Sequence, residues 1–291
     1  MNTFQNNRWV WISLIIIFGL FVLSSIPKII SSSESLSQNE KIGIIKLDGP
    51  IFDVEDLLED LNEFANRDDI KAIVLRINSP GGAVAPSQEL YEKVKDISKE
   101  KPVVTSVSSL AASGGFYAAV GTRKIVANRG SIIGSIGVIV EYPVAVEMLE
   151  KIGLQFETVK SGSAKDIGSP TRPVTKADRE ALESVVNNLH NQFVDAVSSG
   201  RSLERKFVLS IADGRVFTGE QSYELGLVDT LGTMDDAVDL AGQMAGLEES
   251  LERIYPKKKK HSFLDYFFDE LEGRASSYIQ TLPLFQWKLE N

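Results

Sequence analysis

Two glycine-rich turns in the sequence carry serines at places where backbone amides could take part in catalysis. Ser79-Pro80-Gly81-Gly82 follows a predicted strand, and Ala112-Ser113-Gly114-Gly115 lies where a strand is expected to pass into a helix. Glycine permits otherwise strained dihedrals and close approach of N–H groups to a ligand, and a helix N-terminus adds unpaired donors. A serine at such a junction has what acyl transfer requires, an attacking oxygen beside an oxyanion hole. Tight strand-to-helix turns of purely structural importance have the same pattern.

The composition restricts which base could activate such a serine. The 291 residues include no cysteine and only two histidines, which excludes a thiol nucleophile, a disulfide framework and a thiolate zinc site. His190 lies inside a predicted long helix, and His261 follows a run of four lysines. Because neither lies in a glycine-rich turn, a Ser-His-Asp triad is disfavoured. We expect no metal site and no cofactor.

Forty acidic residues outnumber 31 basic ones, and the net charge of −9 argues against nucleic-acid binding, which needs a clustered basic surface. The hydropathy is uneven along the chain. Residues Trp9–Ile26 form an 18-residue stretch without a charged side chain, about the length of a helix that crosses a bilayer. A cleavable signal peptide is the alternative, but its apolar region is shorter and no A-x-A site follows here.

These features predict four segments: a tip and transmembrane anchor over residues 1–27, a polar linker over 28–40, a folded domain over 41–248 that carries both glycine-rich turns and is the candidate catalytic domain, and a tail over 249–291. The tail combines a basic run with an amphipathic helical pattern, which is typical of attachment to a membrane surface. Packing against the catalytic domain or against a neighbouring subunit is the favoured alternative for it.

Within the catalytic domain, apolar runs and helical spacing alternate. The expected strands cover residues 41–48, 72–77, 102–106, 124–127, 136–140 and 156–159, and the expected helices 53–69, 87–98, 176–199, 201–213 and 235–244. The acidic face of the helix over 53–69 is best explained as solvated surface. This alternation predicts an α/β domain with mostly parallel strand pairing.

Four motifs in this order give the sequence a family resemblance. They are Ser79-Pro80-Gly81-Gly82, Ala111-Ala112-Ser113-Gly114-Gly115-Phe116-Tyr117, Gly134-Ser135-Ile136-Gly137-Val138 and Lys165-Asp166-Ile167-Gly168-Ser169-Pro170. Together they resemble the signal peptide peptidase A family of membrane-anchored Ser-Lys serine peptidases, over about residues 41–246. The resemblance implies a ClpP/crotonase-like spiral of repeated β-β-α units, preceded by one transmembrane helix.

The resemblance also implies Ser113 as nucleophile and Lys165 as general base. Lysine ordinarily has a pKa near ~10.4 and is protonated at neutral pH, so a catalytic lysine must be buried or held by groups that favour the neutral amine. We expect hydroxyl groups to hold Lys165, with Ser135 the first choice and Ser169 the second. The neighbouring carboxylate of Asp166 would stabilise the ammonium and should therefore point away from the site.

For the oxyanion hole we expect the backbone N–H of Gly114 together with that of Gly81 or Gly82. The resemblance implies a homo-oligomer, because a single-copy chain of this kind builds its sites between subunits. It further implies an extracytoplasmic catalytic domain at the plasma or inner membrane that cleaves hydrophobic peptides, including signal peptides. A crotonase-type acyl-CoA enzyme and a non-catalytic membrane scaffold are the alternative functions.

Overall fold

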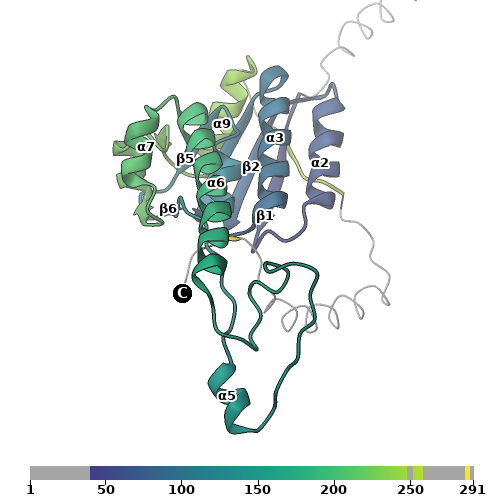
Figure 1. Ribbon diagram of the computed structural model, residues 1–291. Coiled ribbons are helices and arrows are strands. Elements are labelled where there is room, and N and C mark those ends of the chain that lie inside the picture. The colour runs from purple at the N-terminus through teal and green to yellow at the C-terminus, as the bar shows by residue number, and fades with distance from the viewer. Residues whose placement is uncertain (1–39, 248–251, 258–285, 289–291) are drawn as a thin grey trace, which may run out of the picture. The chain divides into compact units, whose positions relative to one another are not determined.

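The computed structural model describes residues 40–247, 252–257 and 286–288 (Figure 1). The predicted anchor and nearly all of the predicted linker lie outside the described residues, as do His261 and most of the tail. Within the described ranges, no helix combines the length and the apolar character needed to cross a membrane.

Among the described residues, a mostly parallel sheet of eight strands forms the centre of the predicted catalytic domain (Figure 1). Its strands are β1 (Lys41–Asp48), β2 (Ile70–Ser79), β4 (Val103–Ala112), β5 (Lys124–Ala127), β6 (Ile132–Gly134), β7 (Val216–Thr218), β8 (Thr230–Leu231) and β9 (Glu252–Ile254). The main path runs β7-β6-β4-β2-β1-β9, and among the described strands of this sheet only β6 and β7 pair antiparallel. Residues 72–75 in the middle of β2 are all buried, which is why this part reads as a continuous apolar run, as strands covered on both faces do.

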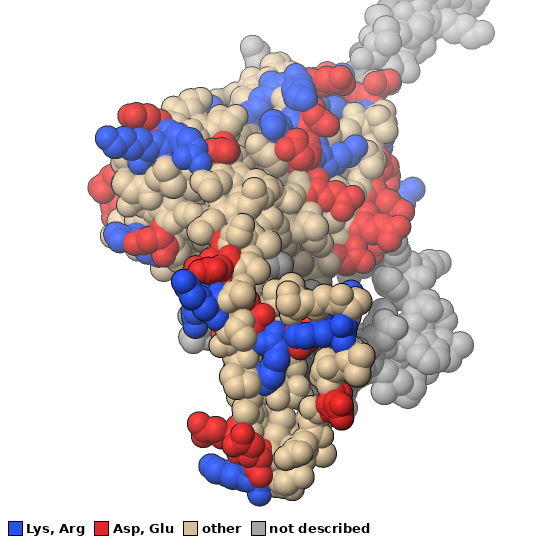
Figure 2. Space-filling view, in the orientation of Figure 1, with Lys and Arg blue, Asp and Glu red and all other residues tan. Residues whose placement is uncertain are grey.

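Helices cover both faces of this sheet. The helices of the described residues are α2 (Glu55–Asn66), α3 (Val84–Glu100), α4 (Gly114–Ala119), α5 (Val146–Lys151), α6 (Lys176–Arg201), α7 (Arg205–Ile211), α8 (Gly219–Glu224) and α9 (Met234–Met244), of which α5 lies away from the sheet. The larger core cluster includes side chains of α2, α3, α4 and α6, and a second cluster joins α9 to the other face. The space-filling view shows acidic side chains gathered over the region of α2 (Figure 2).

The predicted α/β class with mostly parallel pairing is confirmed, and two of the predicted strands are wrong. In place of the strand expected over residues 136–140, the structure has β6, which ends at Gly134. The chain turns there because Gly134 and Ser135 have φ values of 99° and 51°. Residues 156–159 form no strand. Val159 is 96% exposed, and a strand needs a hydrogen-bonded neighbour, which this segment does not have within the described chain.

Residues 140–173, which we call the arm, extend away from the sheet and carry α5 (Figure 1). Several large apolar side chains of the arm are exposed, including Met148, Ile152 and Phe156. Much of the surface of the arm is uncharged in Figure 2. Exposed apolar surface of this extent is typical of a segment that another molecule covers.

A short strand from the predicted tail pairs with the catalytic domain. β10 (Gln286–Lys288) runs antiparallel to β3 (Gly81–Ala83), with Trp287 opposite Gly82 and Lys288 opposite Gly81. On its other side, β3 is bridged by Ile51. These three tail residues therefore lie against the glycine-rich turn that follows β2.

Candidate active site

Ser113 lies at the junction between β4 and α4 in a strained backbone conformation. Its φ and ψ are 52° and −119°, which few residues other than glycine adopt, and such strain is concentrated at functional sites. The surrounding structure fixes the turn, because the Ser113 N–H donates to the Gly134 carbonyl at 2.8 Å and the Ser113 carbonyl accepts from the Tyr117 N–H at 2.9 Å. The Ser113 hydroxyl does not cap the helix.

The hydroxyl oxygen of Ser113 is buried and has no hydrogen-bond partner within the described residues. Buried polar atoms are nearly always paired, so an unpaired one requires an explanation. A nucleophile that is waiting for its base and its substrate is one such explanation, and the position of Ser113 at a helix N-terminus agrees with it.

The two glycine-rich turns lie side by side, and their glycines are needed for that contact. A Cβ on Gly114 would lie 2.3 Å from the Ser87 Oγ and 3.3 Å from the Gly81 Cα. A Cβ on Gly115 would lie 2.8 Å from the carbonyl oxygen of Ser79. The sequence identified both turns, and the structure brings them together around Ser113.

The three predicted oxyanion donors differ in their surroundings. Gly114 is the first residue of α4, so its N–H has no partner within the helix. The Gly81 N–H donates to the Ser79 Oγ at 3.2 Å. The Gly81 carbonyl and the Ala83 N–H bond to Ile51, so alternation along the strand turns the polar backbone groups of Gly82 toward the opposite edge, where β10 pairs. Gly114 therefore has an N–H without a partner in its helix, whereas Gly82 faces the edge that β10 occupies. Which of these amides form an oxyanion hole stays a prediction.

Ser135 belongs to the same neighbourhood. It is 5% exposed and directly follows Gly134, the residue that accepts the Ser113 N–H. Its own N–H donates to the Arg215 carbonyl at 2.9 Å. Ser135 is thus near the candidate nucleophile, but no hydrogen bond connects it with Lys165 within the described chain.

Lys165 lies on the arm and is exposed. The backbone N–H of Lys165 donates to the Gly162 carbonyl at 3.2 Å, in a turn that continues to Ser169. The Ser169 hydroxyl is bonded to the Thr171 hydroxyl at 2.9 Å, so it supports its own turn. A single chain therefore groups Ser113, the glycines and Ser135, while Lys165 and Ser169 remain on the arm.

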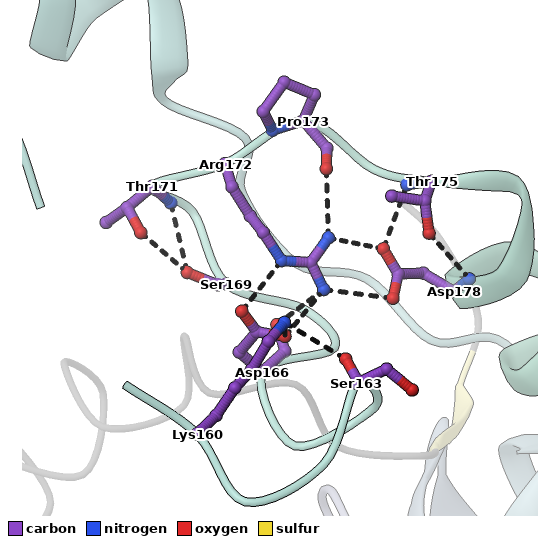
Figure 3. Close-up of polar contacts among 9 residues, drawn as sticks. All are labelled: Lys160, Ser163, Asp166, Ser169, Thr171, Arg172, Pro173, Thr175 and Asp178. Atoms are coloured by element: carbon purple, nitrogen blue, oxygen red, sulfur yellow. Dashed lines mark hydrogen bonds and ion pairs between the residues drawn. The ribbon is translucent and has the colours of Figure 1, made fainter. Parts of the chain in front are cut away.

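A charged cluster that was not predicted from the sequence includes Asp166, the residue that follows Lys165 in the chain (Figure 3). The Asp166 carboxylate accepts from Arg172 Nε and Nη2, both at 2.9 Å, and from Lys160 Nζ at 2.6 Å. The same guanidinium donates to Asp178 at 2.5 and 3.0 Å. Hydrogen bonds from Arg172, and then from Lys160, hold the pKa of Asp166 well below its usual range. Asp166 thus turns its carboxylate toward Arg172 and Lys160. That it points away from an assembled catalytic site stays a prediction.

Asp178 also caps α6, through reciprocal bonds between its carboxylate and the Thr175 N–H and between its own N–H and the Thr175 hydroxyl. The Thr175-x-x-Asp178 spacing resembles a capping box and could have indicated the start of α6. Arg172 has no comparable local signal, because its partners come from both sides of an irregular loop.

His190 has a structural contact, as expected. Its Nε2 bonds to the Ala212 carbonyl at 2.8 Å and links α6 to the end of α7. No other described residue supplies a histidine, so the described part of the chain contains no imidazole at the Ser113 turn.

Comparison with known proteins identifies the family. The model of peptidase family S49 matches residues 95–248, slightly more than half of the chain. The chain belongs to peptidase family S49. The match to this family contains both Ser113 and Lys165, and a Clp protease model matches residues 32–139, which contain Gly81 and Gly82. The resemblance to the signal peptide peptidase A family is thereby confirmed.

Three relatives illustrate this membership in S49. The chain is 46% identical over 177 residues to a putative protease of Synechocystis, which covers 61% of this chain and 64% of that protein. It is 40% identical over 191 residues to a putative protease of Methanocaldococcus jannaschii, covering 66% and 60%. It is 32% identical over 239 residues to the putative signal peptide peptidase SppA of Enterococcus faecium, covering 75% and 70%. The chain thus spans less than two thirds of the length of the first two relatives.

Proposed function

We propose that this protein is a serine endopeptidase in which Ser113 is the nucleophile and Lys165 the general base. The observation that carries the proposal is the buried hydroxyl of Ser113, which has no partner in the described part of the chain and belongs to a strained turn packed against a second glycine-rich turn. Membership in family S49 supports it independently. In this proposal, the parallel sheet and the helices that cover it form a ClpP/crotonase-like spiral.

The proposed reaction has two stages. The neutral amine of Lys165 takes the hydroxyl proton as Ser113 Oγ attacks the peptide carbonyl carbon, and the resulting oxyanion accepts hydrogen bonds from the N–H groups of Gly82 and Gly114. Collapse breaks the peptide C–N bond, and the Lys165 ammonium gives its proton to the leaving amine. A water activated by Lys165 then hydrolyses the acyl-enzyme and releases Ser113.

In this proposal, the Ser113 and the Lys165 of one active site belong to neighbouring copies of the chain. A lysine acts as a base only where its surroundings favour the neutral amine, and withdrawal from water does so. Lys165 is exposed in one chain, and the apolar side chains of the arm are exposed with it. Two hollows, of about 420 and 790 Å³, lie along the arm, and Val144 and Val174 line both of them. A second copy packed there would bury the arm and complete the site, as a homo-oligomer.

Gly114→Ala provides a test of the oxyanion hole. The added methyl would meet the Ser87 Oγ and the Gly81 Cα, so the two turns would separate and the amides would lose their alignment. We expect kcat to fall by about 10²–10³-fold, as when one oxyanion donor is lost, with the circular dichroism spectrum unchanged. Adding Ser87→Gly removes the nearest obstacle and should recover part of the activity.

Gly130→Ala is the matched control, because a Cβ there meets no atom within 4 Å. It should retain wild-type kcat. Full activity of Gly114→Ala would remove its amide from the proposed site.

The edge of β3 is the proposed binding place for the substrate backbone. Extended peptides bind proteins by adding a strand to an open sheet edge, and β10 demonstrates that the edge of Gly81–Ala83 accepts an antiparallel strand. The substrates we propose are hydrophobic peptides such as released signal peptides. The 18 uncharged residues of Trp9–Ile26 would anchor the enzyme at the plasma or inner membrane, with its catalytic domain outside the cytoplasm.

Removing residues 286–291 should raise kcat/KM for short peptides several-fold, because β10 and the substrate compete for one edge. The gain should lie mainly in KM, which initial-rate measurements over a range of peptide concentrations separate from kcat. A synthetic peptide of residues 284–291 should restore inhibition of the truncated enzyme. Unchanged kinetics on truncation, with no inhibition by that peptide, would show that substrate uses another edge.

A further inference from the structure

The cluster of Lys160, Asp166, Arg172 and Asp178 connects the turn of Lys165 to the long helix α6 (Figure 3). Arg172 is the central member. Beyond its bonds to both carboxylates, its Nη2 donates to the Asp166 carbonyl at 3.2 Å and its Nη1 to the Pro173 carbonyl at 3.0 Å. One side chain thus holds the main chain next to Lys165 and the first turn of α6 at the same time.

The cluster is attached, through Asp178, to a helix that is partly buried in the core. Asp178 is part of the capping box of α6, and the distal half of that helix buries Phe193, Val194 and Val197 in the main core. The Asp178 and Asp166 side chains are 7% and 14% exposed. A bidentate arginine in such a setting fixes geometry more precisely than a single exposed ion pair does. Arg172 is therefore suited to setting the position of the Lys165 turn relative to the catalytic domain.

The cluster also determines which charge acts on Lys165. Asp166 is its neighbour in sequence, and a free carboxylate there would favour the ammonium form of a lysine. Both carboxylate oxygens are occupied, Oδ2 by Arg172 and Oδ1 by Arg172 and Lys160. From α6, Asp178 shares the same guanidinium, while Lys176 and Glu180 pair with each other at 3.4 Å.

We propose that Arg172 is a positioning residue for Lys165. Its guanidinium holds the turn that carries the Lys165 amine, and it engages the carboxylate of Asp166. The inference rests on the proposed function of Lys165 as general base. Arg172 itself does not contact the substrate; it acts through Asp166 and the turn.

The test compares Arg172→Gln, Arg172→Lys and the double variant Arg172→Gln/Asp166→Asn in the full chain. Arg172→Gln should lower kcat by about 10²-fold, the cost of misplacing a catalytic group by about 1 Å. It should also move the acid limb of the kcat/KM–pH profile to higher pH, because the released Asp166 carboxylate then favours the Lys165 ammonium. Arg172→Lys should recover only part of kcat, because an ammonium cannot make the forked contacts.

The double variant separates the two effects. Without the carboxylate, the acid limb should return to its wild-type pH while kcat remains low, since the turn is still released. Arg205→Gln is the matched control: Arg205 pairs with Asp195 at 2.6 Å on the surface, and its loss should alter neither quantity. Thermal unfolding of every variant checks that the fold is retained. If Arg172→Gln does not fold, the single variant Asp166→Asn replaces it. Asp166→Asn should lower kcat without moving the acid limb to higher pH.

Unchanged kcat and an unmoved acid limb in Arg172→Gln would overturn the inference, and so would a fall in kcat with the acid limb of Arg172→Gln unmoved. Where Asp166→Asn replaces Arg172→Gln, wild-type kcat in Asp166→Asn would overturn the inference. Failure of the proposed function has a different signature, which is an active Lys165→Ala enzyme. An inactive Lys165→Ala enzyme together with a fully active Arg172→Gln enzyme would overturn the role of Arg172 alone.

Discussion

Replacing Ser113 by alanine is expected to abolish peptide hydrolysis, and replacing Lys165 by alanine to do the same. In a serine peptidase the nucleophile and its base act as one unit, and loss of either costs on the order of 10⁶-fold in kcat. The Ser113 turn holds its conformation through backbone bonds to Gly134 and Tyr117, so alanine should leave the fold intact. Lys165 is exposed, so its truncation should leave the folded chain equally stable.

Two controls match these variants closely. Ser222 is also fully buried, and its hydroxyl has no partner among the residues that the structure describes. It lies in α8 rather than in a glycine-rich turn, so Ser222→Ala should retain activity. Lys206 is an exposed lysine on α7, and Lys206→Ala should be silent. Wild-type kcat in Ser113→Ala or in Lys165→Ala would contradict the proposed dyad, whereas equal losses in all four variants would indicate a general effect on folding.

Mixing the two inactive variants is expected to restore activity. If Ser113 and Lys165 of one site come from neighbouring chains, a site formed by the intact serine of a Lys165→Ala chain and the intact lysine of a Ser113→Ala chain is complete. In a closed ring with repeated head-to-tail interfaces, random equimolar mixing should rebuild about a quarter of the sites. The exposed apolar side chains of the arm are the reason to expect such an interface.

The recovery is measured after the variants are unfolded and refolded together, with native mass spectrometry to verify that mixed oligomers form. A chain carrying both substitutions is the control, because it supplies neither group and should restore nothing with either partner. Absence of activity in verified mixed oligomers would contradict shared sites and would require Lys165 to reach Ser113 within one chain.

The sequence predicted well those elements that its own local pattern specifies. The strands over 41–48 and 124–127 have the predicted bounds, and the helix predicted over 176–199 extends from Lys176 to Arg201. Continuous apolar runs and helical spacing depend on burial within one chain. Both strands and the C-terminal half of α6 are buried in that way, and a capping box at Thr175 marks the start of α6. The two glycine-rich turns were identified because glycine is required where backbones approach each other closely.

The elements that were missed or misplaced depend on partners far along the chain. β3, β9 and β10 have three residues each, too few for a periodic pattern, and only their pairing defines them as strands. Residues 156–159 have strand-forming side chains but no neighbour in the described chain, which agrees with the proposal that a second copy covers the arm. The importance of Lys165 came from the family motif alone, because an exposed lysine has no local feature that distinguishes it.

The nucleophile is the centre of this account, and covalent labelling tests it most directly. A fluorophosphonate probe reacts with an activated serine, and digestion followed by mass spectrometry identifies the modified residue. We predict one adduct per chain, on Ser113, that is absent in Ser113→Ala and strongly reduced in Lys165→Ala. An unlabelled wild-type oligomer, or an adduct on any other serine, would contradict the assignment of Ser113 as the nucleophile.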